Sequence, residues 1–90
     1  MELTQEAIEE LKKSNLYPSF IDEMIKGNGE TEDTTYVGEY KGFFLFESET
    51  DEENFALNSK YYEKEEFNIS SYDGINEVKE YIDEAIENGF

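Results

Sequence analysis

The sequence predicts a single α+β domain: two N-terminal helices, a small antiparallel sheet of three to four strands, and a C-terminal helix packed on one face. Two observations predict this fold, namely helical periodicity at both ends of the chain and aromatic and β-branched residues between them. A third, the 16% aromatic content, argues for a packed core despite a net charge of −17. Ninety residues suit one domain, and we expect its helices to share one face of the sheet.

The first helix has a well-marked start and end. Thr4 is suited to cap it, and Leu3 can pack on Ile8 as a hydrophobic staple. Lys12 and Lys13 in the last turn favour an end near residues 14–15.

A second short helix is predicted within residues 16–27. Pro18 is tolerated in a first helical turn, and Lys26 followed by Gly27 is a favourable C-terminal signature. Its buried stripe is expected to contain Phe20, Ile21, Met24 and Ile25.

Residues 35–48 have strand character. They fit one long kinked strand or, the interpretation we favour, two strands that join near Lys41 and Gly42. Strand alternation then puts one set on one face (Tyr36, Gly38, Tyr40, Gly42, Phe44, Phe46) and the other set on the opposite face (Val37, Phe43, Leu45). A third strand is expected at residues 54–59 and a fourth within residues 61–69.

The C-terminal helix is the clearest element. Ser70, Ser71 and Asp73 offer caps, and Asn88 with Gly89 should end the helix. Apolar residues repeat at helical spacing at Ile75, Val78, Tyr81, Ile82, Ala85 and Ile86.

Several residue types are absent, and each absence removes a chemistry. The chain has no cysteine, histidine or arginine, which removes disulfides, thiolates, the usual near-neutral general base and the bidentate phosphate ligand. We therefore expect neither an enzyme nor a bound cofactor or metal. No apolar run is long enough to span a bilayer and no signal peptide is visible, so we expect a cytoplasmic protein that avoids nucleic acids and anionic membranes.

Acidic residues gather in four clusters. From Glu47 to Glu53, five of seven residues are acidic. On the C-terminal helix, a stripe of glutamates lies opposite the apolar face, although like charges at this spacing cost about 0.2–0.5 kcal/mol per pair. The four clusters are Glu30, Glu32 and Asp33; Glu47, Glu49, Asp51, Glu52 and Glu53; Glu63, Glu65 and Glu66; and Glu77, Glu80, Glu84 and Glu87.

Clustered acids can serve calcium binding, catalysis or adaptation to salt. An EF-hand loop starting at Asp51 would need glycine where Ala56 stands, so no dedicated calcium site is expected. Paired carboxylates could serve glycosidase-type chemistry, but among 24 acidic residues pairs arise by chance. Halophilic adaptation and simple solubility remain open alternatives.

A basic protein partner explains the single sign of the charge. Carboxylates along a helix face repeat every ~4.5–6 Å, which is comparable to phosphate spacing along a nucleic-acid strand. The acidic clusters beginning at Glu47, Glu63 and Glu77 are therefore candidate contacts, with Tyr61 and Tyr62 as aromatic anchors. One ring of the Tyr61–Tyr62 pair should point outward, whereas Phe67 is expected in the core.

In size, charge and acidic-aromatic stretches such as residues 47–54 and 61–67, the chain resembles small acidic inhibitors encoded by phages and mobile elements. The nearest are anti-CRISPR proteins that block RNA-guided nucleases by occupying their DNA-binding surface. The resemblance is compositional and rests on no shared motif. It implies a stoichiometric blocker without catalytic residues, and we expect this chain to act as a DNA mimic. We also expect a monomer, because the large net charge disfavours self-association. Acidic immunity proteins that neutralise basic toxins would look similar, and an accessory phage domain without mimicry is a third alternative.

Overall fold

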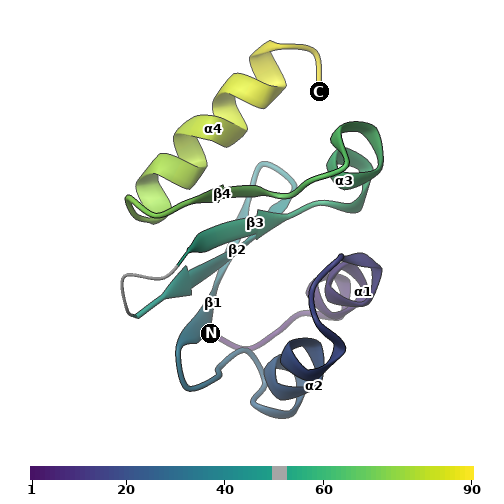
Figure 1. The fold of residues 1–90 in the computed structure, drawn as a ribbon, viewed down its shortest axis with the longest axis vertical. Coiled ribbons are helices and arrows are strands. Elements are labelled where there is room, and N and C mark those ends of the chain that lie inside the picture. Colours follow the sequence, from purple (N-terminus) through teal and green to yellow (C-terminus); the bar gives the residue numbers. More distant parts are fainter. Residues whose placement is uncertain (50–52) are drawn as a thin grey trace.

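The computed structural model describes residues 1–49 and 53–90, and in these ranges the chain forms four helices and four strands (Figure 1). The sheet is antiparallel throughout, with the strands in sequence order. The predicted α+β layout is therefore confirmed. The elements are α1 (Gln5–Lys13), α2 (Pro18–Lys26), β1 (Thr34–Tyr40), β2 (Phe43–Ser48), β3 (Asn54–Leu57), α3 (Ser59–Glu65), β4 (Ile69–Ser71) and α4 (Ile75–Glu87).

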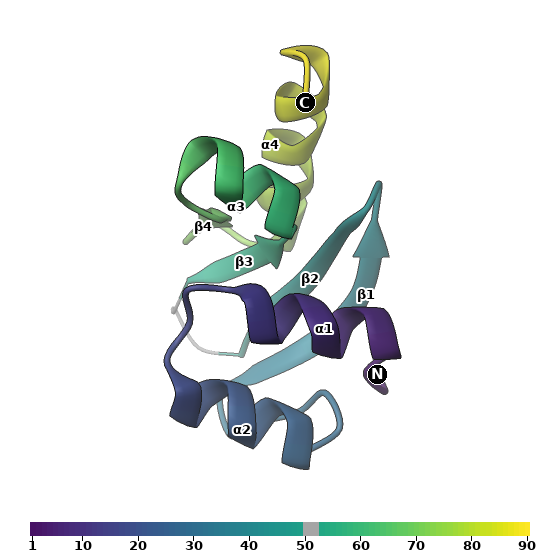
Figure 2. The same cartoon turned by 90° about the vertical axis from the view of Figure 1, so that its right-hand side faces the viewer.

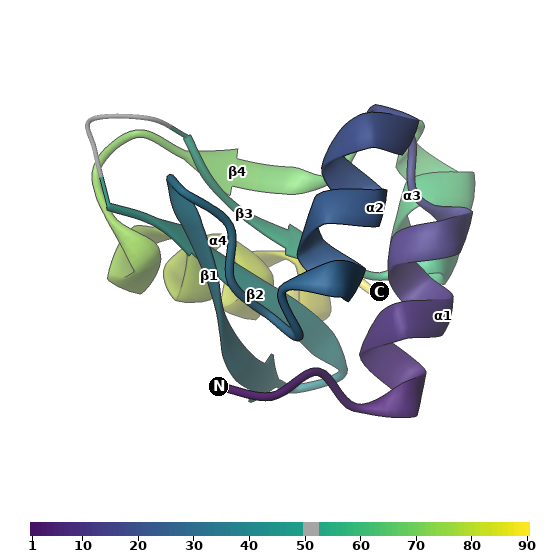
Figure 3. The same cartoon turned by 90° about the horizontal axis from the view of Figure 1, so that it is seen from below.

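Helices cover both faces of the sheet. Helices α1 and α2 lie side by side on one face and α4 lies on the other (Figures 2 and 3). We call the two buried clusters the α1/α2 core (Ala7, Leu11, Met24, Tyr36, Phe44, Phe46, Leu57) and the α4 core (Phe43, Leu45, Ala56, Ile69, Val78, Ile82).

The expectation that the helices share one face was wrong, and β2 supplies the reason. Its residues Phe43 to Phe46 are buried at four consecutive positions. Because successive strand residues point to opposite faces, such a strand needs cover on both sides. The N-terminal helices supply one cover and the C-terminal helix supplies the other.

Both N-terminal helices form where the sequence places them. The Thr4 hydroxyl accepts a hydrogen bond from the Ala7 N–H at 3.1 Å, as an N-cap should. Pro18 occupies the first turn of α2, whose Met24 is fully buried. Each helix thus buries a narrow stripe in the α1/α2 core.

Strands β1 and β2 form the predicted hairpin through Lys41 and Gly42. Both residues have positive φ, at 50° and 88°, which suits the right-handed twist of a two-residue hairpin turn. A register shift between Tyr36 and Gly38 then changes the alternation of β1. Tyr40 therefore packs against the α4 core, and its predicted place on the same face as Tyr36 was wrong.

Residues 59–65 form helix α3, where a strand was predicted. The Asn58 side chain caps this helix by accepting from the Lys60 and Tyr61 N–H groups. Glu10 of α1 adds a second cap, because its carboxylate accepts from the Ser59 N–H at 2.6 Å and from the Ser59 hydroxyl at 3.1 Å. The fourth strand is confined to β4, which begins at Ile69.

Helix α4 spans the predicted range and ends at the Asn88 cap. Val78 and Ile82 are fully buried, whereas Tyr81 and Ile86 at the edges of the apolar stripe are 40% and 39% exposed. Gly74 takes the N-cap position without a side-chain cap. Ser71, predicted as a cap, instead donates its hydroxyl to Glu77.

Candidate acidic binding surface

Ser48, Glu49 and Asn54 are held by hydrogen bonds to other segments. Buried Asn54 accepts a hydrogen bond from the Ser48 N–H at 2.8 Å and donates one to the Ser71 carbonyl at 3.3 Å. The Glu49 N–H donates to the Asp33 carbonyl at 2.8 Å. Glu47, Glu49 and Glu53 are exposed, whereas Asp51 and Glu52 lie outside the described residues. The first two acidic clusters of the sequence therefore meet in space.

A tight turn presents Glu32 and Asp33. Thr31 closes it, because the Thr31 hydroxyl accepts from the Thr34 N–H at 3.0 Å and the Thr31 N–H donates to the Thr34 carbonyl at 2.8 Å. Both carboxylates of the turn are exposed. Threonine bonds in the turn thus hold two acids at its tip.

A groove of about 710 Å³ lies beside this turn, on the sheet face that α1 and α2 cover. Phe20, Phe55, Leu16 and Phe67 supply its apolar surface. Four exposed acids also line it, namely Glu23, Glu32, Asp33 and Glu53. Among the described residues that line the groove, none carries a positive charge.

The cluster on α3 is exposed, but its tyrosines are not free anchors. Glu63, Glu65 and Glu66 are exposed. The Tyr61 ring packs edge-on against Phe43, Phe67 and Phe90, with centroids 5.2–5.7 Å apart, and burial raises the pKa of its hydroxyl. Tyr62 is half-buried.

Phe67 was predicted in the core, and this was wrong. Its ring is 52% exposed, because α3 ends at Glu65 and the turn carries residue 67 outward before β4 begins. Of the aromatic residues in this segment, Phe67 and not Tyr61 is the exposed one.

Helix α4 exposes three of its four striped glutamates. Glu80, Glu84 and Glu87 are exposed, whereas Glu77 is half-buried and hydrogen-bonded. The Glu77 carboxylate accepts from the Tyr81 hydroxyl at 2.6 Å and from the Ser71 hydroxyl at 2.9 Å. These two bonds, the Tyr81 bond foremost, lower the pKa of Glu77. Glu77 therefore fastens α4 to β4 and is less available to a partner than predicted.

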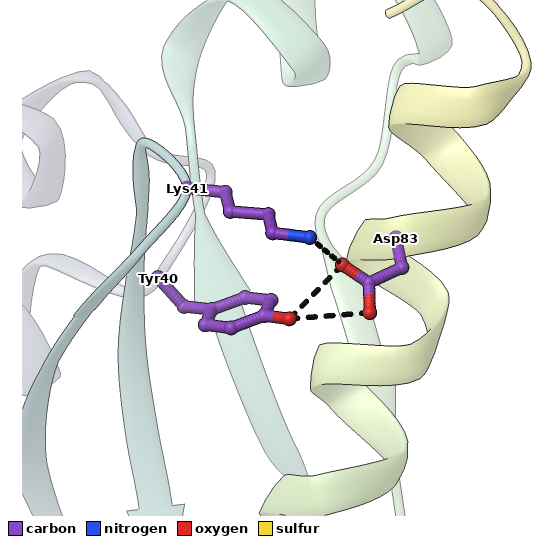
Figure 4. Close-up of polar contacts among 3 residues, drawn as sticks. All are labelled: Tyr40, Lys41 and Asp83. Atoms are coloured by element: carbon purple, nitrogen blue, oxygen red, sulfur yellow. Dashed lines mark hydrogen bonds and ion pairs between the residues drawn. The ribbon is translucent and has the colours of Figure 1, made fainter.

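The opposite flank of α4 is fastened by Asp83. Its carboxylate accepts from Lys41 Nζ at 2.6 Å and from the Tyr40 hydroxyl at 3.0 and 3.1 Å (Figure 4). The hydrogen bond from Lys41 is the main cause that lowers the pKa of Asp83, and the same bond raises the pKa of Lys41. This contact joins the hairpin turn to α4.

The remaining lysines neutralise little of the charge. Within residues 1–49 and 53–90, Lys41–Asp83 is the single ion pair. In the same ranges no group of three or more acidic residues is arranged to hold a metal ion. Every buried side-chain nitrogen or oxygen of the described residues has a hydrogen-bond partner. Apart from Asp83, the carboxylates of the described residues thus have no cation within ion-pairing distance.

No described helix combines the length and apolar character needed to cross a bilayer. Comparison of the chain with protein-family models, curated proteins and solved structures returned no match.

The groove shows what the sequence did not reveal. Of its four acids, only Glu53 belongs to the predicted contact residues. Glu32 and Asp33 were recognised as a cluster, but Glu23 on α2 carried no signal of its own. The groove combines α2, the turn before β1, β3 and the segment before β4, and no local pattern brings such distant segments together.

Proposed function

We propose that this chain is an acidic inhibitor protein that binds the nucleic-acid-binding surface of a basic protein, such as a host defence nuclease, and blocks it by occupation. The observation that carries the proposal is the unneutralised surface: 24 acidic residues, seven lysines and one ion pair within the described ranges. A surface of mixed charge would pair more of its lysines with neighbouring acids. An excess of exposed carboxylates instead raises the rate of encounter with a positive cleft.

Helix α4 offers the regular part of this surface. Glu80, Glu84 and Glu87 are exposed along it, and at a rise of 1.5 Å per residue successive carboxylates are about 4.5–6 Å apart along the axis. That separation is close to the phosphate repeat of a nucleic-acid strand. Two flanking contacts, Glu77 with Ser71 and Asp83 with Lys41, hold the helix on the sheet. Because the helix is already held in place, its row of carboxylates would lose little conformational entropy on binding.

The test is inhibition of guide-loaded RNA-guided nucleases by the purified protein, measured as DNA cleavage with competing double-stranded DNA. We expect inhibition that weakens as NaCl rises and that disappears when target DNA is bound first, since both ligands would occupy one surface. Replacing Glu80, Glu84 and Glu87 with Gln should weaken inhibition by about threefold to 150-fold, because three lost charge pairs are worth roughly 0.2–1 kcal/mol each. Replacement of Glu2, Glu6 and Glu9, which are exposed on the N-terminal segment and α1, is the matched control.

Two results would contradict DNA mimicry. One is inhibition that excess DNA leaves unchanged, and the other is an equal loss in both triple variants. Binding to a basic nuclease toxin, outside its DNA-binding cleft, would instead support the immunity-protein alternative.

A further inference from the structure

The groove beside α2 has the composition of a peptide-binding site. Its apolar surface is formed by Phe20, Phe55 and Leu16, which are half-buried, and by Phe67, which is 52% exposed. Apolar surface of this kind gains about 25 cal/mol for each Å² that a ligand removes from water. The rings therefore favour a ligand with apolar or aromatic side chains.

The rings are held in place by their neighbours. Phe55 stacks on buried Phe46, with centroids 5.1 Å apart, and meets Phe20 edge-on at 6.0 Å. Phe67 packs edge-on against Tyr61 at 5.6 Å. A ligand would thus meet side chains whose positions the core already fixes, so little conformational entropy is lost on binding.

The rim of the groove selects the charge of the ligand. Glu23, Glu32, Asp33 and Glu53 come from three separate segments and line one groove, which no described cation lines. Two side chains hold the rim in place, because the Thr31 hydroxyl accepts from the Thr34 N–H and the Asn54 side chain accepts from the Ser48 N–H. A carboxylate ligand or a phosphate would be repelled, and Lys or Arg side chains would find acceptors on several sides.

We propose that this groove binds an extended segment of a basic protein partner in which lysine or arginine alternates with apolar side chains. The apolar side chains would lie on Phe20, Phe55 and Phe67, and the cations would reach Glu23, Glu32, Asp33 and Glu53. This rests on the proposed function only in taking the partner to be a basic protein. The groove would be a second binding site, on the opposite face of the sheet from α4. It would recognise apolar as well as charged side chains of the partner.

Phe67 gives this site an anchor. Its ring lines the groove and also a second hollow of about 320 Å³ toward α4, which Tyr81 and Glu84 line as well. The segment 67–70 therefore separates two hollows. A chain seated in the first hollow would contact a ring that is exposed before binding.

The probe is a short peptide in which lysine alternates with phenylalanine, and a lysine–serine peptide of equal charge is its control. We expect the lysine–phenylalanine peptide to bind at least about tenfold more tightly, because burial of one large apolar side chain is worth about 1.5–3 kcal/mol. Amide chemical shifts in NMR spectra should change around Phe20, Phe55 and Phe67. Equal affinity for the two peptides, or shift changes confined to α4, would overturn the proposal.

Two pairs of variants test the site with matched controls. Glu23→Gln, Glu32→Gln, Asp33→Asn and Glu53→Gln together should weaken peptide binding about tenfold more than Glu2→Gln, Glu6→Gln, Glu9→Gln and Glu39→Gln, which remove the same charge from exposed positions outside the groove. Phe67→Ala should lose about tenfold in affinity, and Tyr72→Ala, at a 71% exposed tyrosine outside the groove, should lose nothing. If the groove variant and its control lose the same affinity for the peptide, in either pair, the proposal for the groove fails. NMR spectra of each variant report whether it is folded.

The two proposals can fail separately. If the groove variants still inhibit the nuclease in full, and DNA still competes with them, the proposal for the groove fails and the proposed function stands. If the peptide binds in the groove but the protein inhibits no nuclease, the proposed function fails and the proposal for the groove stands.

Discussion

At the scale of the residue, the most informative side chains are acids that serve the fold. Glu77 and Asp83 flank the buried stripe of α4, and each accepts hydrogen bonds from a tyrosine and from one further side chain. In the sequence they look like members of one charged helix face. Tyr81 lies on α4 itself, but Ser71 and Lys41 lie outside this helix. Helical periodicity alone therefore could not distinguish Glu77 and Asp83 from Glu80 and Glu84.

The pKa of Glu77 gives the first prediction. Because this pKa is lower in the folded protein than in the unfolded chain, the unfolded chain takes up the proton first as pH falls. The stabilising contribution is therefore complete above the unfolded value of about 4.3 and is lost as pH falls through the lowered folded value. Glu77→Gln should lower the free energy of unfolding most above about pH 5. The difference in this free energy between the variant and the wild type should shrink as pH falls.

Urea unfolding across this pH range measures the effect. Glu80→Gln, at an exposed position on the same helix, removes the same charge and is the control. A Glu77→Gln difference that is constant with pH would contradict the role of the ionised carboxylate.

At the scale of the element, α3 shows where local patterns mislead. Residues 61–69 contain two tyrosines and a phenylalanine, which strands favour, and this composition predicted a strand. The helix instead depends on caps: Asn58 lies next to it in sequence, but Glu10 comes from α1. The Asn58 cap could have been recognised from the sequence, whereas a cap donated from 49 residues away could not.

The cap from Glu10 gives the second prediction. Glu10→Ala should lower the free energy of unfolding by about 0.5–2 kcal/mol, the usual cost of losing a helix cap. Glu9→Ala, at the exposed neighbouring position, should have little effect. Urea denaturation with unchanged m-values measures both, and equal stability of the two variants would show that the α1–α3 contact contributes nothing.

The remaining elements were largely predictable. Thr4, Pro18 and the Lys41–Gly42 turn gave correct boundaries because each acts through its own backbone neighbours. The register shift at β1 could not be foreseen, and it placed Tyr40 on the unexpected face. The groove could not be predicted from the sequence for the same reason as the Glu10 cap. Glu23 and Phe67 are far apart in the sequence and line one groove only in the folded chain.

At the scale of the whole molecule, net charge opposes folding. A charge of −17 on 90 residues repels itself, and one ion pair within the described ranges relieves little of this repulsion. The proposed function would explain why the repulsion persists, because a surface that is neutralised within the chain has less to offer a basic partner.

Self-repulsion gives the third prediction. Raising NaCl from about 0.01 M to about 0.5 M shortens the Debye length from about 30 Å to less than 8 Å and should raise the melting temperature. Each kcal/mol of screened repulsion is worth about 4–8 °C in a domain of this size. Calorimetry measures the shift, with sorbitol at equal osmolarity as the control. A melting temperature that is independent of NaCl would mean that the charges are too far apart to interact.

Strand β2 has a consequence for misfolding. In most sheets that expose one face to solvent, a shift of one residue in strand register moves the apolar side chains to the solvent face. Such a shift is therefore energetically unfavourable. Here Phe44 and Phe46 point to one face and Phe43 and Leu45 to the other, so a slipped strand would still bury aromatic and aliphatic groups on both sides. Hydrophobicity alone therefore does little to select the correct alignment. That selection falls to the Lys41–Gly42 turn, with its two positive φ angles, and to the Asn54 side chain, which ties the far end of β2 to β4.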